Sequence, residues 1–260
     1  MGQAVIVEAV RTPLGRRDGM LKDVHPTELA AAALNEVVRR AGIEPVQVDD
    51  IIMGCVSQVG DQALNIGRNS SILAGFPVEV PATTVDRQCG SSQQAVHFAA
   101  SLIDSGVAEI VIAAGVESMT RVPMGSTRAN GPGYPFTDAL KTRYPLVAMG
   151  VSAEMLAEKW QLSREALDVY GLRSHRLAGQ ATAEGFFRRE ILPLDVKVNG
   201  TTKSVDQDEG IRYDTSLEKL GSLKTPFKEG GVVTAGNASQ ISDGARFLTR
   251  LEKLLKSDFE

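Results

Sequence analysis

Short apolar runs alternate along the first half of the chain with longer stretches whose apolar residues recur at helical spacing. We expect strands at residues 4–10, 51–56, 83–85 and 108–115. We expect helices at residues 28–41, 63–74 and about 89–104, which end near Gly42, Gly75 and Gly106. The run at 4–10 is continuous and β-branched, which is typical of a strand buried on both faces. This alternation of strands and helices favours an α/β fold with a mostly parallel sheet between helices.

After residue 117 the residue composition of the sequence changes. Residues 120–136, TRVPMGSTRANGPGYPF, are dense in glycine, proline and arginine, and helical spacing returns at 151–186. This pattern predicts an inserted, α-rich subdomain. We expect exposed hairpins or loops at 193–208, and then a strand at 232–236, VVTAG, that returns the chain to the sheet.

The end of the sequence shows a different pattern. Leu248, Leu251, Leu255 and Phe259 follow one helical stripe, with lysine and glutamate on the other face. This spacing predicts an amphipathic terminal helix. The expected divisions are a core at 1–117, an inserted subdomain at 118–230, a return strand at 231–245 and a tail helix at 246–260.

Composition narrows the class of protein. At 260 residues, 43% of them apolar, the chain is large enough to bury a substantial core. It has 28 lysine and arginine residues against 32 aspartate and glutamate, which argues against nucleic acid or an anionic membrane as a partner. Its apolar runs are far shorter than the roughly 20 residues of a membrane span, and its N-terminus lacks a secretory signal pattern. We expect a soluble, cytoplasmic protein whose partners are small molecules or protein.

The candidate chemistry centres on Cys89 in VDRQCGSSQQAVHFAA, residues 85–100. If a helix begins at or just after Cys89, the unpaired N–H groups of its first turn favour a thiolate, the nucleophilic form of cysteine. A cysteine at this position can equally be a small residue that fills the corner between strand and helix. The local pattern leaves both interpretations open. The other cysteine, Cys55, shares no metal-binding spacing with it.

A nucleophilic thiol usually has a base beside it. His97 lies further along the expected helix, about 12 Å from Cys89 along the axis, which is too far for a pair. His25 precedes a helix and fits a turn, and His175 lies among arginines on an amphipathic stretch. None of the three histidines is therefore a convincing partner for Cys89.

Four separated stretches carry a family resemblance. They are AVIVEAVRTPLGRRDGML (4–21), DRQCGSSQQAVHFAA (86–100), GVESMTRVPM (115–124) and GGVVTAGNASQISDGA (230–245). Together they resemble the N-terminal half of a thiolase, an acyl-CoA acyltransferase, in the order and at the spacing of that family. The resemblance implies a thiolase-like half-domain, with a parallel-rich mixed sheet between helices, and an inserted α-rich loop subdomain that holds coenzyme A.

The resemblance also implies a role for Cys89. It is similar to the cysteine that takes an acyl group from acyl-CoA or a 3-ketoacyl chain, and its backbone N–H is placed to contribute to an oxyanion hole. Thiolases then exchange the acyl group with coenzyme A or acetyl-CoA by cleaving or forming a carbon–carbon bond. Acyl-CoA and coenzyme A are thus the expected substrates, with no cofactor or metal besides them, and a homodimer or homotetramer is expected. Ala148 replaces the histidine common in acetoacetyl-specific members, which favours broader 3-ketoacyl-CoA chains.

By the same resemblance, five residues contact coenzyme A. Met149 corresponds to a methionine beside the pantetheine arm, and Arg212 to an arginine near the adenine end. Phe227, Ala235 and Ser239 correspond to the pocket lining, with the Ser239 hydroxyl available to the pantetheine amides. From the residues alone, these positions are equally consistent with core, solvated surface and turn.

The family's second half supplies a histidine in a Gly-His-Pro context and a further cysteine in a glycine-rich loop, and neither occurs in these 260 residues. We expect the chain by itself to acylate slowly at Cys89 without completing the condensation. Three alternatives stay open: a ketoacyl synthase, a non-catalytic coenzyme A binding or assembly module, and a redox-sensing thiol protein.

Overall fold

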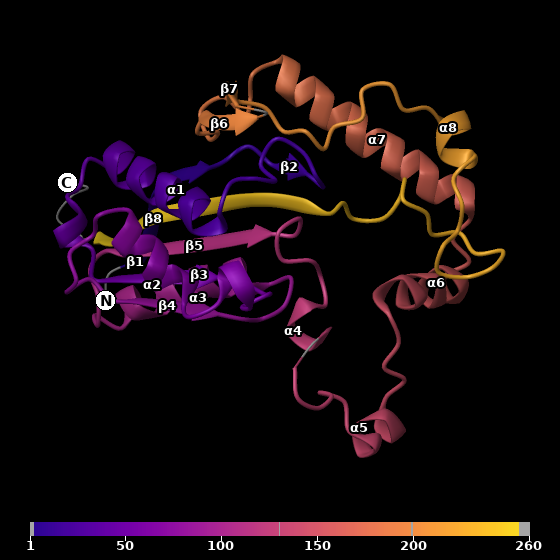
Figure 1. Cartoon of the computed structure of the whole chain (residues 1–260), viewed down its shortest axis with the longest axis horizontal. Helices are drawn as coiled ribbons and strands as arrows, with labels where there is room; N and C mark the ends of the chain where they lie inside the picture. Colours follow the sequence, from indigo (N-terminus) through magenta and orange to yellow (C-terminus); the bar gives the residue numbers. More distant parts are fainter. Residues whose placement is uncertain (1–2, 130, 199, 255–260) are drawn as a thin grey trace. The chain divides into compact units, whose positions relative to one another are not determined.

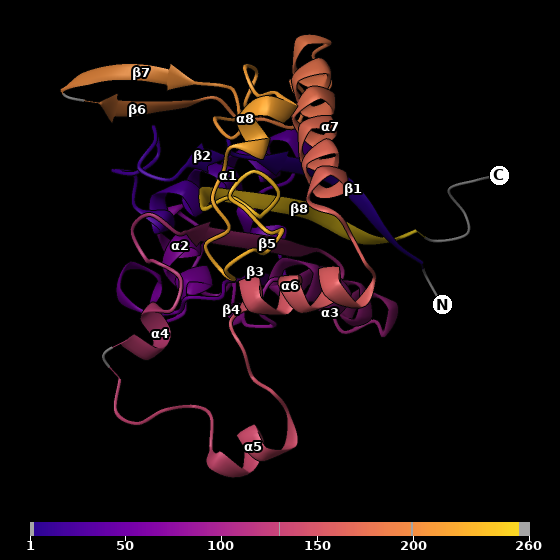
Figure 2. The ribbon, with the colours of Figure 1, turned by 90° about the vertical axis from the view of Figure 1, so that its right-hand side faces the viewer.

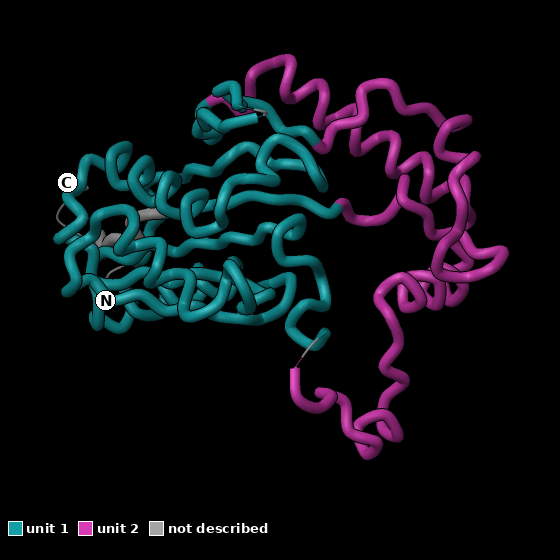
Figure 3. Tube along the Cα trace, in the orientation of Figure 1, with its two compact units in different colours: residues 1–130, 189–209, 241–260 teal, residues 131–188, 210–240 magenta. Residues whose placement is uncertain are grey.

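The computed structural model describes residues 3–129, 131–198 and 200–254. The chain divides into two compact units (Figure 3). The core unit comprises residues up to 130, 189–209 and from 241 onward, and the inserted unit comprises residues 131–188 and 210–240. Residues 189–209 therefore group with the core, whereas we expected them within the inserted subdomain.

The core unit is built on a mixed sheet with the strand order β1-β8-β5-β3-β4, and β2 pairs with β8 beside this path (Figure 1). Its strands are β1 (Gln3–Arg11), β2 (Gly15–Arg16), β3 (Asp50–Gly54), β4 (Ala82–Val85), β5 (Val111–Ser118) and β8 (Ser242–Leu254). β3 runs parallel to β4 and β5, whereas β8 runs antiparallel to β1 and β5. The expected α/β fold with a mixed sheet is confirmed, and parallel pairing among the described strands is confined to β3, β4 and β5.

Helices cover both faces of this sheet. α1 (Pro26–Ala41) shares a buried cluster with Ile51 and Met53 of β3, while α3 (Ser91–Asp104) packs with Ile52 on the opposite face. Because side chains alternate along a strand, neighbouring residues of β3 enter two different cores. This arrangement explains why β3 reads as a continuous apolar run.

The other elements of the core unit are smaller. They are α2 (Ile66–Leu73), α4 (Ser126–Ala129), the 3-10 helices η1 (Pro45–Gln47) and η2 (Gly60–Gln62), β6 (Leu194–Val198) and β7 (Thr201–Val205). β6 and β7 pair only with each other among the described strands, and Figure 2 shows them as a two-stranded ribbon of their own. The hairpin expected at 193–208 is therefore confirmed.

Local sequence signals set both ends of α1. The side chain of His25 accepts a hydrogen bond from Thr27 N–H, and the Glu28 carboxylate accepts one from His25 N–H, which completes a capping box. Gly42 ends the helix at φ 66°, in the left-handed region that glycine adopts readily. The interpretation of His25 as a turn residue is thus confirmed.

Two expected elements near the end of the chain are wrong. Residues 232–236 form a loop rather than a strand, and residues 246–254 belong to β8 rather than to a tail helix. β8 pairs with β1 on one side and β5 on the other. Pairing on both sides satisfies the backbone groups of three strands at once, and this outweighs the helical spacing of a few leucines. Residues 255–260 of the expected helix lie outside the described residues.

The expectation that residues 4–10 are buried on both faces is also wrong. β1 is an edge strand of the described sheet. Ile6 and Val7 are 55% and 42% exposed, whereas Val10 is buried. A continuous apolar run does not by itself distinguish a central strand from an edge strand.

The inserted unit is rich in helix, as expected. Its helices are α5 (Asp138–Arg143), α6 (Met149–Lys159), α7 (Arg164–Ala183) and α8 (Leu217–Gly221). The helical stretch expected at 151–186 is divided between α6 and α7 by a turn in which Gln161 has φ 52°. Ser163 then caps α7, because its hydroxyl accepts a hydrogen bond from Ala166 N–H at 3.1 Å.

Candidate functional site

Cys89 lies in the turn that joins β4 to α3, and its side chain is exposed. The turn is closed by a hydrogen bond from Gly90 N–H to the Arg87 carbonyl oxygen at 3.1 Å. The Ser91 hydroxyl braces it further, because it accepts from Arg87 N–H at 2.9 Å and donates to the Gln88 carbonyl oxygen at 2.6 Å. Cys89 therefore lies at the corner between strand and helix, as expected, and its thiol is exposed on a turn that Ser91 holds in place before α3.

The residue before the thiol has an uncommon backbone conformation. Gln88 has a φ of 48°, in the left-handed region that residues other than glycine rarely occupy. Its N–H donates to the Asp86 carboxylate at 2.7 Å. Such a conformation costs about 1–3 kcal/mol and persists where the surroundings hold it, which happens most often at functional sites.

Cys55, which follows β3, is the opposite case. Its side chain is buried. Burial raises the pKa of the Cys55 thiol, and the negative charge of Glu117 adds to this effect. A buried, protonated thiol is inert, so Cys89 is the cysteine placed to react.

The start of α6 brings Met149 close to Phe227 in the inserted unit. Gly150 follows Met149 in the helix, and a Cβ atom on Gly150 would lie 2.1 Å from Cδ1 of the Phe227 ring. The ring thus packs directly on the helix backbone, which only glycine allows at this distance. Met149 and Phe227 remain 63% and 41% exposed. These two expected pantetheine contacts therefore lie at neighbouring, accessible positions.

Ala235 and Ser239 lie in one loop after α8, and both are exposed. Asn237 holds this loop in place. Its Oδ1 accepts from Thr234 N–H at 2.8 Å, and its Nδ2 donates to the buried carboxylate of Asp168 in α7 at 3.0 Å. Asp168 was not among the residues expected from the sequence. The available signal was an acidic residue on the face of a helix that also carries its buried side chains.

Arg212 is exposed, and α7 holds its backbone. The Arg212 N–H donates to His175 Nδ1 at 3.2 Å. The ring of Tyr213 lies against Gly179 of α7, where a Cβ atom would come within 3.1 Å of Tyr213 Cε1. Burial lowers the pKa of His175, and the positive charge of Arg212 adds to this effect. His175 therefore places the Arg212 backbone, a contact that sequence reasoning did not find.

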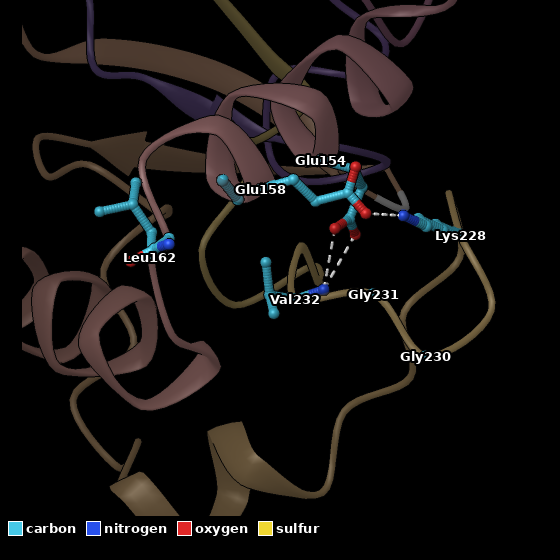
Figure 4. Close-up of a pocket in the computed structure, with 9 residues that line it drawn as sticks. Glu154, Glu158, Leu162, Lys228, Gly230, Gly231 and Val232 are labelled. Atoms are coloured by element: carbon cyan, nitrogen blue, oxygen red, sulfur yellow. Dashed lines mark hydrogen bonds and ion pairs between the residues drawn. The ribbon is translucent and has the colours of Figure 1, made fainter.

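A surface pocket of about 310 Å³ lies between α6 and a glycine-containing loop of the same unit (Figure 4). The buried Glu154 carboxylate accepts from Val232 N–H at 2.9 Å and from Val233 N–H at 2.8 Å. Glu158 forms an ion pair with Lys228 at the edge of this pocket. None of the expected site residues lines this pocket, and these polar groups already have partners. The contacts around this pocket therefore hold the loop that contains Val232 against α6.

The six expected site residues divide between the two units, with Cys89 in the core unit and the other five in the inserted unit. Within the part of the chain that the structure describes, no three His, Cys, Asp or Glu side chains gather as metal ligands would. Among the helices of that same part, none has both the length and the apolar content that a membrane span requires.

Residues 4–249 match the family described as the thiolase N-terminal domain. The chain belongs to the thiolase family. The match runs from β1 into β8 and so includes the turn that carries Cys89. The thiolase resemblance inferred from four short stretches of sequence is confirmed.

Individual thiolases agree with this assignment. A steroid 3-ketoacyl-CoA thiolase from Mycobacterium tuberculosis is 44% identical over 253 residues, which cover 94% of this chain and 61% of the relative. A 3-ketoacyl-CoA thiolase from Bacillus subtilis is 40% identical over 265 residues, with 97% and 66% covered. The crystal structure of the Bacillus anthracis acetyl-CoA acetyltransferase matches with a TM-score of 0.85 at 39% identity, over 97% of this chain and 66% of that one. The chain therefore spans between 61% and 66% of the length of these three thiolases.

Proposed function

We propose that this thiolase chain takes an acyl group from an acyl-CoA thioester onto the sulfur of Cys89. The observation that carries the proposal is the exposed thiol on the braced turn before α3, in a chain of the thiolase family. The N–H groups of the first turn of α3 lack partners within the helix, and they favour negative charge on a sulfur beside them. A thiolate is both a good nucleophile and a good leaving group for thioester exchange.

The acylation step exchanges one thioester for another. The Cys89 sulfur forms a bond to the carbonyl carbon of the acyl group, and the bond between that carbon and the coenzyme A sulfur breaks. The proton of the Cys89 thiol ends on the released coenzyme A thiol, so charge and atoms balance. The Cys89 N–H is proposed as one donor to the carbonyl oxygen while that oxygen carries negative charge.

Five residues of the inserted unit are proposed to bind coenzyme A. Met149 and Phe227 supply exposed apolar surface for the pantetheine arm, and Ala235 lines the same path. The exposed Ser239 hydroxyl is available to the pantetheine amides, and the exposed Arg212 side chain to the adenine end of the nucleotide. Each of these roles comes from the thiolase resemblance, and the exposure of all five side chains supports it.

The proposed substrates are 3-ketoacyl-CoA chains of broad length. The Mycobacterium and Bacillus relatives are named as 3-ketoacyl-CoA thiolases, and Ala148 precedes Met149 where acetoacetyl-specific members commonly have histidine. We further propose that the protein needs no cofactor besides coenzyme A and acts in the cytoplasm as a dimer or tetramer. Both cysteines are unpaired, which suits a reducing compartment. Light scattering at several protein concentrations tests the oligomeric state.

Mass spectrometry of the intact chain after incubation with acetyl-CoA tests the central step. The expected result is one added acetyl group, mapped to the peptide that contains Cys89. Cys89→Ser is expected to abolish the addition, and Cys55→Ser, the matched control, is expected to retain it. Arg212→Gln is expected to weaken coenzyme A binding in calorimetry without preventing slow acetylation at high acetyl-CoA concentration.

The outcomes separate the competing functions. Absence of acetylation in the unmodified chain, or acetylation that survives Cys89→Ser, contradicts the proposal. Coenzyme A binding without any acetylation favours a non-catalytic binding module instead. A disulfide or oxidised sulfur on Cys89, formed under mild oxidant in preference to acylation, favours a redox-sensing thiol.

A further inference from the structure

Two glycines lie side by side beneath the first turn of α3. Gly54 ends β3 and pairs in register with Gly115 of β5, and both are buried. The two strands are parallel, so their carboxyl ends meet at one edge of the sheet, which is where α/β proteins commonly place functional residues. Ser92, in the first turn of α3, contacts both positions.

Gly54 leaves room for the helix backbone itself. A Cβ atom there would lie 2.4 Å from Ser92 N, 2.5 Å from the Ser91 carbonyl carbon and 2.7 Å from Ser92 Cα. All three are backbone atoms, which cannot move away as the tip of a flexible side chain can. Any other residue at position 54 must therefore lift the start of α3 from the sheet.

Gly115 leaves room for a side chain instead. A Cβ atom there would lie 1.8 Å from Ser92 Oγ and 2.8 Å from Ser92 Cβ, while the next atom, the Gly54 carbonyl oxygen, is 3.5 Å away. The obstruction at position 115 is therefore entirely the Ser92 side chain. Removal of that side chain would leave only an ordinary van der Waals contact.

We propose that Gly54 and Gly115 are positioning residues for the nucleophile, an inference that rests on the proposed role of Cys89. They let the first turn of α3 sit directly on β3 and β5. The Ser91 hydroxyl, in that same turn, braces the turn that carries Cys89. A lifted helix start moves this brace and so displaces the turn that positions the Cys89 sulfur.

The two sites differ in a way that a rescue experiment detects. Gly54→Ala and Gly115→Ala are each expected to slow alkylation of Cys89 by iodoacetamide at neutral pH, by about 2- to 5-fold. Adding Ser92→Gly should restore the rate of Cys89 alkylation in the Gly115→Ala variant, because it removes the obstructing atoms. It should not restore the rate in the Gly54→Ala variant, where the obstructing atoms belong to the backbone.

Two controls keep the measurement specific. Gly221→Ala in α8, where an added Cβ meets nothing within 4 Å, should leave Cys89 alkylation unchanged. Labelling of the buried Cys55 reports loss of the fold in every variant. If Gly115→Ala exposes Cys55, the double variant with Ser92→Gly decides. Recovery of both Cys55 protection and the rate of Cys89 alkylation supports the proposal, and failure to recover overturns it.

Failure here is distinct from failure of the proposed function. An unchanged rate of Cys89 alkylation in folded Gly54→Ala and Gly115→Ala proteins overturns the positioning role, even if acetyl-CoA acylates Cys89. Rescue of Gly54→Ala by Ser92→Gly overturns it as well. If the alkylation pattern appears as expected but acetyl-CoA never acylates Cys89, the positioning role stands and the acyl-transfer proposal fails.

Discussion

His175 Nδ1 accepts a hydrogen bond from the backbone N–H of Arg212 across 37 residues of sequence, at 3.2 Å. An imidazole nitrogen that accepts a hydrogen bond carries no proton. Burial, and then the positive charge of Arg212, lower the pKa of His175. The neutral ring is therefore the form that holds the Arg212 backbone on α7.

His175 is expected to titrate below the ordinary histidine pKa of about 6.5. At pH values well above this ordinary pKa, His175 is neutral in both the folded and unfolded states and does not affect how the free energy of unfolding depends on pH. As the pH falls below it, the unfolded state takes up the proton first, so the free energy of unfolding decreases. Titration of the imidazole signals by NMR checks the direction, and His175→Gln identifies the signal by removing it.

His175→Gln is also expected to flatten the loss of stability between neutral pH and the folded-state pKa of His175. Urea unfolding at several pH values measures this. A His175 signal that titrates at or above about pH 6.5 contradicts the prediction.

The two cysteines are expected to differ in accessibility. One thiol equivalent should react with a disulfide reagent in the native protein, and the second only after denaturation, because Cys89 is exposed and Cys55 is buried with a raised pKa. Spectrophotometric thiol counting checks this. Cys89→Ser should leave no reactive thiol in the native state, and Cys55→Ser should leave one. Two fast-reacting thiol equivalents in the native protein would contradict the burial of the Cys55 side chain.

A charged cluster joins β1 to the segment that returns from the inserted unit. The Arg11 guanidinium, 8% exposed, binds both oxygens of Asp208 at 2.7 and 2.9 Å and one oxygen of Glu190 at 2.6 Å. Arg11→Met leaves these carboxylates without their cation and should lower the free energy of unfolding by about 3–5 kcal/mol. Arg17→Ala, which removes a pair with Asp18 that is exposed on both sides, should have little effect.

Arg11→Lys gives a second test of the same cluster. Lysine keeps the charge but loses the planar two-pronged contact with Asp208, so an intermediate loss of stability is expected. Chemical denaturation measures all three variants. Equal effects of Arg11→Met and Arg17→Ala would contradict the structural role of the cluster.

Glu154 and Glu158 lie one helical turn apart on α6 but differ in burial. Glu154 is 2% exposed and accepts from two backbone N–H groups, whereas Glu158 is exposed and pairs with Lys228. Glu154→Ala leaves buried N–H groups without an acceptor and should cost about 2–3 kcal/mol. Glu158→Ala is the matched control and should change stability little. Thermal unfolding followed by circular dichroism compares them, and equal melting temperatures would contradict the assigned role of Glu154.

Elements with local signals were predictable from the sequence. Pro26 and Gly42 mark the two ends of α1. The apolar run that begins at Ile51 predicts the strand β3 from its own residues, whatever the strands on either side of it. The turn at Cys89 was predictable for the same reason, since Gly90 precedes an amphipathic helix that begins with two serines. The family resemblance added the roles that the local pattern left open.

The contacts that hold the site were not predictable, because they join residues far apart in the chain. Asp168 and Asn237 are 69 residues apart, and nothing local to either residue indicates the partner. The closeness of Gly54 and Gly115 beneath Ser92 likewise depends on strand register. β8 was misread because its leucines happen to follow a helical spacing, while the alternation that matters lies in Asp243, Ala245 and Phe247.

Phe247 tests the placement of β8 directly. Its side chain is fully buried in the cluster that α1 shares with the sheet, and its backbone pairs with both Val10 and Ala114. Phe247→Ala should lower the free energy of unfolding by about 3–5 kcal/mol, because it removes a large side chain from a packed core. Arg246→Ala, at the exposed neighbouring position, should have a small effect. Urea unfolding of the two variants measures the difference, and a minor effect of Phe247→Ala would contradict the placement of β8 in the core.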